Sequence, residues 1–162
     1  MSSRPQLDDA TQPDDAGLVD LRCSALIYRG DSVLLCRRSD NQDYWSLPGG
    51  TPRYGEGTAA AAAREVAEET GLIISADRVA FVLEASSWDR EQHRIEIVFR
   101  GTEASSDRQP RQLEGLLEPA FVPLTQLSSI SLRPPIGGYI RGLFHTPERT
   151  AAYLGNLWRN QL

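Results

Sequence analysis

Residues 50–72 read GTPRYGEGTAAAAAREVAEETGL, which is the longest helical signal in the first half of the chain. The pattern predicts a helix over 58–70 that is ended by Gly71 as a left-handed cap. Three carboxylates share an arc of about 100° on one face of this helix, namely Glu65, Glu68 and Glu69. The residues expected to face the core are mostly alanine, namely Ala59, Ala63, Val66, Ala67 and Thr70. Such a face can lie close against the core and hold the acidic face rigidly.

The acidic triplet needs an explanation, because like charges at this spacing repel by roughly a few tenths of a kcal/mol per exposed pair. One explanation is the solvated acidic surface of an ordinary helix. The other is a hard divalent cation with oxygen ligands, Mg²⁺ or Mn²⁺, which would remove the repulsion. The compact triplet, the cap at Gly71 and the glycine turn at 49–50, which lets backbone approach a ligand, favour the metal site.

The same segment resembles the Nudix box, G-x5-E-x7-R-E-U-x-E-E-x-G-U, where U is a bulky aliphatic residue. Every specified position is matched, by Gly50, Glu56, Arg64, Glu65, Val66, Glu68, Glu69, Gly71 and Leu72. The preceding segment 45–49, WSLPG, resembles the lead-in common in this family. The resemblance implies an α/β (α+β) protein, a Nudix-type α/β/α sandwich with a mixed β-sheet between helices, along most of 18–145.

The resemblance also implies roles for the carboxylates. Glu68 and Glu69 would be the main metal ligands, and the backbone carbonyl of Gly49 would add another. Glu65 would be a third ligand or the base that activates water. The implied cofactor is Mg²⁺, with Mn²⁺ as an alternative.

Four further glutamates and one arginine belong to the same expectation. Glu56 and Arg64 would pair across the loop and support the site structurally. Many relatives carry another catalytic glutamate on a loop beyond the box, and Glu114 matches that position best, with Glu118 and Glu91 as competitors. The alternative for Glu114 is an ordinary solvated side chain.

Substrate contacts lie outside the matched positions. Arg38, at the end of a predicted strand, and Arg53, inside the box loop, could hold phosphate. Trp88 could stack on a base, as could Tyr44 and Trp45, although the lead-in tryptophan commonly packs on the fold. For each arginine, an ordinary surface position is the alternative.

The function implied is metal-dependent hydrolysis of a diphosphate linkage in a nucleoside triphosphate or another nucleoside-diphosphate-linked small molecule. The segment 85–89, ASSWD, lacks the proline typical of ADP-ribose pyrophosphatases, which weakens that assignment. One alternative is a non-catalytic nucleotide-binding or regulatory module with the same fold. An isomerase on this scaffold would need a catalytic cysteine, for which Cys23 and Cys36 are poor candidates because both lie in apolar strand segments.

The composition excludes several other classes. The chain has 162 residues with a net charge of −5, and residues 1–20 hold five aspartates against one arginine. No basic face is evident, so we expect no DNA-binding surface. No apolar run approaches the ~20 residues that span a bilayer, and no secretion signal is evident, so the prediction is a cytoplasmic protein without a membrane contact.

The remaining chain predicts one domain over 18–162, preceded by a disordered acidic tail over 1–17. A hairpin of strands is predicted over 19–28 and 32–36, and further strands near 78–86, 94–101 and 119–122. The C-terminal part predicts two helices, near 136–144 and 147–160. The second carries Tyr153, Leu154, Leu157 and Trp158, which could form a homodimer interface or pack back on the domain.

Overall fold

The computed structural model describes residues 17–40, 43–86, 92–149 and 152–157. Apart from Gly17, the predicted tail lies outside these residues, as do Trp88, Glu91 and Trp158. In the described part of the chain, no helix is long and apolar enough to cross a membrane.

The box helix, α1, runs over Thr58–Thr70, which confirms the predicted bounds. It ends at Gly71, whose φ of 74° is left-handed and whose N–H donates to the Ala67 carbonyl at 3.0 Å. The predicted core-facing side is confirmed in part, because Val66 and Thr70 are buried, but Ala61, Ala62 and Glu69 are buried as well. The buried side is therefore rotated toward the acidic face. Residues 59–63 are all alanine, so the sequence does not indicate which side of the helix faces the core. As a consequence, one carboxylate of the acidic face, that of Glu69, is buried against the rest of the domain.

Five strands form the first sheet, in the order β5-β1-β7-β6-β9. They are β1 (Val19–Leu26), β5 (Gly49–Gly50), β6 (Ile74–Ser86), β7 (His93–Glu103) and β9 (Tyr153–Asn156). Strands β1 and β7 run parallel, with Arg22 opposite Glu96, and β1 is antiparallel to β5, with Cys23 opposite Gly50. Segments far apart in the sequence are thereby brought to one place beside α1.

The second sheet contains four short strands. They are β2 (Tyr28–Arg29), β3 (Ser32–Arg38), β4 (Tyr44–Ser46) and β8 (Leu117–Pro123). The predicted hairpin survives only as β2 and β3, which pair around Gly30. The strand predicted over 19–28 is divided, and its first part, β1, pairs with β5 and β7 in the other sheet. The single sheet expected is therefore two sheets.

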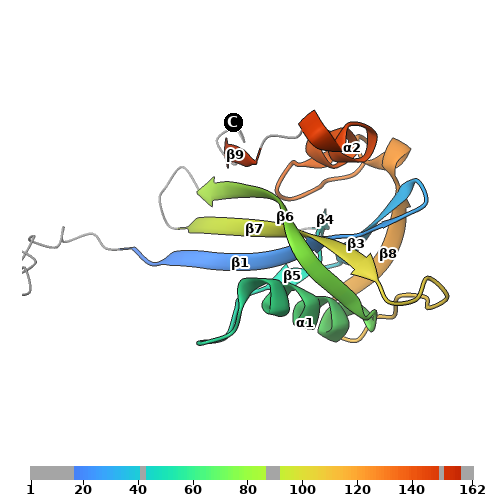
Figure 1. Cartoon of the computed structure of the whole chain (residues 1–162), viewed down its shortest axis with the longest axis horizontal. Helices are drawn as coiled ribbons and strands as arrows, with labels where there is room; N and C mark the ends of the chain where they lie inside the picture. The colour runs from blue at the N-terminus through green and yellow to red at the C-terminus, as the bar shows by residue number, and fades with distance from the viewer. Residues whose placement is uncertain (1–16, 41–42, 87–91, 150–151, 158–162) are drawn as a thin grey trace, which may run out of the picture.

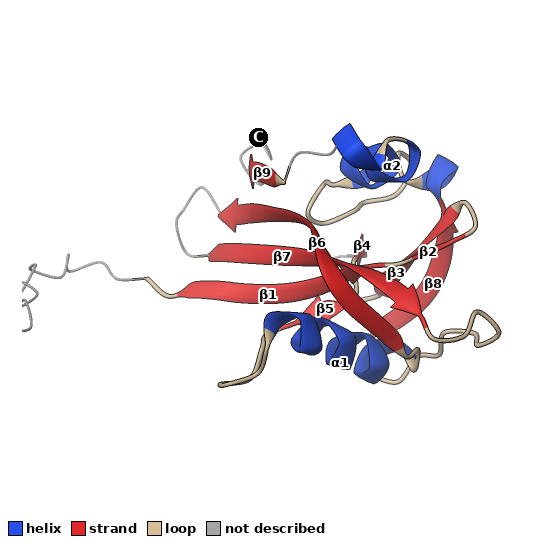
Figure 2. Cartoon of the chain, viewed as in Figure 1, coloured by secondary structure: helices blue, strands red, loops and turns tan. Residues whose placement is uncertain are grey.

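Helix α2 (Gly137–His145) lies on the opposite side of the sheets from α1 (Figures 1 and 2). A short helical turn, η1 (Leu124–Gln126), follows β8. Between the two layers lies a core that includes Phe81, Leu83, Val98 and Ile140. The helices thus cover both faces of the strands, and α1 packs on two smaller buried clusters through Ala61, Ala62 and Val66.

The second predicted C-terminal helix was wrong. After the turn η2 (Pro147–Arg149), the described chain continues as the strand β9, which pairs with β6. Gly155 has a φ of 74°, which an uninterrupted helix does not allow. Leu154 and Leu157, two of the four residues suggested for a homodimer interface, pack against the core of their own domain and are partly buried there.

Candidate active site

The glycine turn before α1 brings backbone against a buried carboxylate. A methyl group on Gly49 would lie 2.5 Å from the Cys23 carbonyl oxygen, so only glycine fits between β5 and β1. The Gly49 N–H donates to Oε2 of Glu69 at 3.1 Å. The turn therefore fixes one carboxylate of the acidic face directly.

Glu69 is only 5% exposed. Its Oε2 atom also lies 3.8 Å from the Cys36 sulfur, which donates a weak hydrogen bond. Burial raises the pKa of Glu69 to about 7, although Arg22 and the Gly49 N–H oppose this rise, and the charges of Glu65 and Glu114 add to it. A carboxylate with these surroundings binds a proton or a cation readily near neutral pH.

Arg64 is the centre of an ion-pair network on the other side of the box. It contacts both oxygens of Glu56, at 2.7 and 3.0 Å, so the predicted pair is present. Hydrogen bonds from Arg64, and then from the Arg53 backbone N–H, lower the pKa of Glu56 to about 2. The same guanidinium reaches Glu65 at 2.9 Å and Glu68 at 3.1 Å. One arginine thus joins the loop carboxylate to two carboxylates of the helix.

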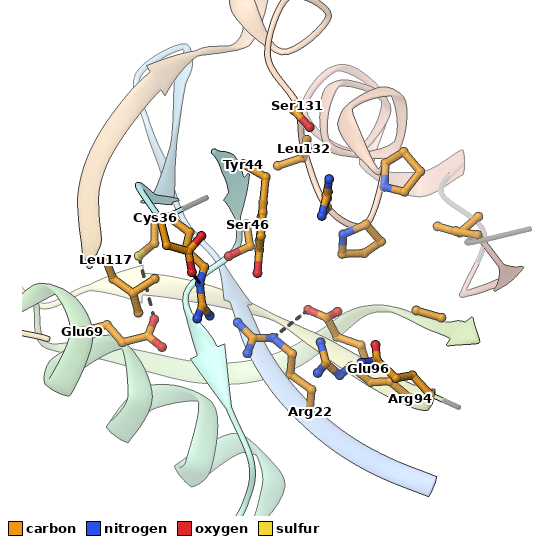
Figure 3. Close-up of a pocket in the computed structure, with 18 residues that line it drawn as sticks. Arg22, Cys36, Tyr44, Ser46, Glu69, Arg94, Glu96, Leu117, Ser131 and Leu132 are labelled. Carbon is orange, nitrogen blue, oxygen red and sulfur yellow. Dashed lines mark hydrogen bonds and ion pairs between the residues drawn. The ribbon is translucent and has the colours of Figure 1, made fainter. Parts of the chain in front are cut away.

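A cavity of about 800 Å³ lies beside α1, and Glu69 is in its wall. This volume falls within the roughly 300–1,000 Å³ typical of small-molecule sites. Its charged lining residues are Arg22, Arg38, Asp40, Glu69, Arg94, Glu96 and Arg133. Figure 3 shows Arg22, Arg94 and Glu96 on the side of the long strands, and Tyr44, Ser131 and Leu132 on the facing side. A cavity with several arginines next to a helix with several carboxylates suits an anionic ligand and a cation together.

The family model of the NUDIX domain matches residues 20–143, which is most of the chain and includes the box helix. The chain belongs to the Nudix family. The Nudix protein is 36% identical over 76 residues to an ADP-ribose pyrophosphatase from Methanocaldococcus jannaschii. That match covers 46% of the chain and 45% of the relative, so the chain spans less than half of that relative's length.

Solved structures agree with this fold. A MutT protein from Methanosarcina mazei Go1 is 25% identical with a TM-score of 0.67, over 83% of the Nudix protein and 99% of that chain. A Nudix hydrolase from Nitrosomonas europaea is 20% identical with a TM-score of 0.70, over 82% and 92% of the two chains. The predicted fold class, mixed strands between helices, is therefore confirmed.

The carboxylates of the Nudix protein do not form a ready metal cage. Among the described residues, no group of three or more His, Cys, Asp or Glu side chains is arranged to hold a metal ion. The reason is that Glu65 and Glu68 are turned toward Arg64, whereas Glu69 faces Gly49. The donors nevertheless fit a hard cation in kind, because all are carboxylate oxygens within one stretch of helix.

The two arginines predicted to contact substrate lie in different surroundings. Arg38 lines the cavity, where it pairs with Asp40 at 2.6 Å. Arg53 does not line it; its side chain is 69% exposed and lies 3.4 Å from Glu68. Arg38 therefore remains a candidate for the substrate, while Arg53 is placed at the outer edge of the carboxylate face.

The loop glutamate and the aromatic residues can be placed in part. Glu114 is exposed, and it lies near enough for its charge to affect Glu69, after the larger effect of burial. Tyr44 lines the cavity, and Trp45 packs against the core, as expected for the lead-in residue. Trp88 lies outside the described residues.

The cavity of the Nudix protein also contains three charged residues that were not predicted from the sequence, namely Arg22, Arg94 and Glu96. Glu96 stands between Ile95 and Ile97, and this alternation predicts a side chain directed to solvent. It is instead 2% exposed. The sequence does show a charged residue within each of two predicted strands, which could have indicated a polar site. Only the pairing register of β1 and β7 shows that Arg22 and Glu96 are neighbours.

Proposed function

We propose that this Nudix protein hydrolyses a diphosphate linkage in a nucleoside triphosphate or another nucleoside-diphosphate-linked substrate, with a divalent cation. The single observation that carries the proposal is the position of Glu69, which belongs to the box helix and also lines the arginine-containing cavity. A triphosphate would give a nucleoside monophosphate and pyrophosphate.

The arginines supply the anion-binding part of the site. Arg22 donates to the Leu47 carbonyl at 2.9 Å and lies 3.6 Å from Glu96, so it stands between the glycine turn and the interior of the cavity. Arg38 and Arg94 line the same cavity. Guanidinium groups form charge-assisted hydrogen bonds with phosphate oxygens, so these side chains would hold and orient the diphosphate.

The carboxylates would hold the cation. Glu65, Glu68 and Glu69 are the proposed ligands, with the Gly49 carbonyl, for Mg²⁺ or Mn²⁺. When bound, the cation neutralises the charge of a diphosphate and acidifies a water molecule. Glu114 is the proposed proton acceptor from water, because it lies near enough for its charge to raise the pKa of Glu69.

ADP-ribose is a second candidate substrate. The relative from Methanocaldococcus jannaschii is named for that activity, and it shares 36% identity over 76 residues. The missing proline in the segment 85–89 weighs against it, so ADP-ribose belongs in the assay beside the nucleoside triphosphates.

Two other functions have less support. The box is intact, whereas a non-catalytic module has no need of each matched carboxylate. An isomerase that uses cysteine has little support, because Cys23 and Cys36 are both buried and burial raises the pKa of each thiol.

The decisive experiment is a panel of the common nucleoside triphosphates, ADP-ribose and nucleotide sugars with Mg²⁺ or Mn²⁺. Products are identified by chromatography. A Glu68→Gln, Glu69→Gln double variant is expected to lose at least roughly 100-fold in kcat, since several kcal/mol of charge stabilisation are removed. Glu84→Gln, on β6 and outside the cavity lining, is the matched control and should keep full activity. Cation binding by calorimetry without turnover of any substrate would favour the non-catalytic module.

A further inference from the structure

Glu96 is a buried carboxylate in the first half of β7, in the wall of the cavity. It is 2% exposed. The Ser24 hydroxyl donates to its Oε1 atom at 2.6 Å, and the Arg22 Nε atom lies 3.6 Å from the same oxygen. Within the described residues, both of these contacts involve Oε1 and neither involves Oε2. One oxygen of a nearly buried carboxylate is thus left for a ligand.

This arrangement is costly for a side chain with a purely structural role. Removing a carboxylate from water costs several kcal/mol unless its oxygens receive hydrogen bonds. One hydroxyl and one guanidinium at 3.6 Å contact Oε1, whereas Oε2 opens to the cavity, although the flanking Ile95 and Ile97 show that apolar residues suit this strand. A ligand that donates hydrogen bonds to Oε2 would compensate.

The facing wall of the cavity carries a planar pair, the Tyr44 ring and the Arg133 guanidinium. The Arg133 guanidinium lies over the Tyr44 ring, 4.7 Å from its centroid. The backbone N–H of Arg133 donates to the Trp45 carbonyl at 2.8 Å, and this hydrogen bond joins the segment around Arg133 to β4. Tyr44 and Glu96 therefore face one cavity from opposite sides (Figure 3). A flat group that stacks on one side and is hydrogen-bonded at its edge on the other fits these surroundings.

We infer that Glu96 recognises the base of the substrate through hydrogen bonds and that the preferred base is guanine. A carboxylate only accepts hydrogen bonds, and each of its oxygens can accept two. Guanine presents two adjacent donors, its N1–H and its exocyclic amino group, which suit Oε2 and the remaining lone pair of Oε1. Adenine and cytosine place a ring nitrogen acceptor beside their amino group, and that lone pair would repel the second carboxylate oxygen. Uracil and thymine have one N–H between two carbonyl oxygens, which would also be repelled.

The cavity provides a path from this base to the proposed cleavage site. Arg22 contacts the Leu47 carbonyl, and Gly49, two residues further on, contacts Glu69. A nucleotide with its base at Glu96 would therefore extend its phosphates along Arg22 toward α1. The inference rests on the proposed function for the identity of the reaction, but base recognition itself can be measured without turnover.

The test compares guanine with adenine nucleotides in the wild type and in Glu96→Gln. We expect the wild-type kcat/KM for GTP to exceed that for ATP by at least roughly tenfold, because a site built for hydrogen bonds rejects a base that leaves them unmade. Glutamine has the same shape, but it replaces one acceptor with a donor. The variant should lose the preference or shift it toward adenine, mainly through KM for GTP. Glu84→Gln should retain it.

A second readout is independent of catalysis. Calorimetric titration without added metal should show tighter binding of GMP than of AMP to the wild type, and this difference should disappear in Glu96→Gln. Thermal unfolding checks that the variant is folded. If Glu96→Gln does not fold, Ser24→Ala serves instead, because it removes the hydroxyl that orients Glu96 and should weaken the preference in the same direction.

Three results on nucleotide binding and on the variant would overturn the inference. They are equal binding of GMP and AMP by the wild type, a guanine preference that survives in Glu96→Gln, and an equal loss for every nucleotide in that variant. The last would show that Glu96 only orients Arg22. Turnover of nucleotides without a preference for guanine would overturn the inference and leave the proposed function intact. Tighter binding of GMP without turnover of any substrate would support the inference while contradicting the proposed hydrolase.

Discussion

The carboxylate of Glu65 lies directly against Gly50, so that a methyl group added to Gly50 would lie 2.4 Å from both its Cδ and its Oε1 atoms. The obstacle is the end of a side chain, which can rotate away at little cost to the fold. We therefore expect Gly50→Ala to displace Glu65 and to lower kcat by roughly 100-fold, as a misplacement of about 1 Å can do. The melting temperature should change little.

Gly49→Ala is the matched comparison. Its added methyl would meet the Cys23 carbonyl oxygen and the Ser24 Cα atom, and this backbone cannot move without disturbing β1. The expected cost is about 1–3 kcal/mol in the free energy of unfolding. Denaturant titrations and kcat measurements on both variants would check the contrast. Full activity of Gly50→Ala would show that the position of Glu65 does not matter.

The Glu56–Arg64 pair predicts a pH dependence of stability. Hydrogen bonds from Arg64 and the Arg53 N–H lower the pKa of Glu56 to about 2, from an ordinary value of 4.5. Its stabilisation is therefore complete above pH 4.5 and is lost as the pH falls toward 2. Glu56→Gln should melt at a lower temperature than the wild type at pH 7, and the two melting temperatures should converge in acid.

Circular dichroism melts at several pH values would measure this difference. Glu148→Gln, an exposed residue in η2, is the control and should follow the wild type throughout. A gap between wild type and Glu56→Gln that stays constant to the lowest pH would show that the effect does not come from ionisation of Glu56.

The box helix was predictable because its signals are local. The cap at Gly71 and the spacing of the glutamates lie within a few turns, so the bounds Thr58–Thr70 were confirmed. The rotation of the helix was not predictable, because residues 59–63 are all alanine and look alike from every side. That rotation decides that Glu69, among the three glutamates, is the buried one.

Long-range pairing was the other limit. The segment 19–36 has the pattern of one hairpin, yet β1 pairs with β7, which lies more than sixty residues later in the chain. The cavity depends on this pairing, because it places Arg22 opposite Glu96. Similarly, β9 is only four residues long, and its pairing with β6 leaves no periodic pattern in the sequence.

The surroundings of Cys36 predict an unreactive thiol. It is 1% exposed, and burial, followed by the charge of Glu69, raises its pKa. Alkylation by iodoacetamide at pH 8 should leave the native protein unmodified, whereas both cysteines should react in guanidinium chloride; mass spectrometry would count the adducts. Cys36→Ala should keep activity within a few-fold of the wild type. Rapid alkylation of Cys36 with loss of activity would contradict this and would revive the cysteine-dependent isomerase.

Arg29 and Glu103 predict a contrast between a buried and an exposed ion pair. Arg29 reaches both carboxylate oxygens, at 3.0 and 2.5 Å, and the two side chains are 22% and 8% exposed. Arg29→Met would leave Glu103 largely buried without its guanidinium, and we expect a loss of about 2 kcal/mol in the free energy of unfolding. Arg37 and Asp43 form a similar pair with side chains 43% and 63% exposed. Arg37→Met should cost less than about 0.5 kcal/mol, because water screens that pair. Urea titrations of the two variants would measure both values, and equal losses would show that burial does not determine the strength of these pairs.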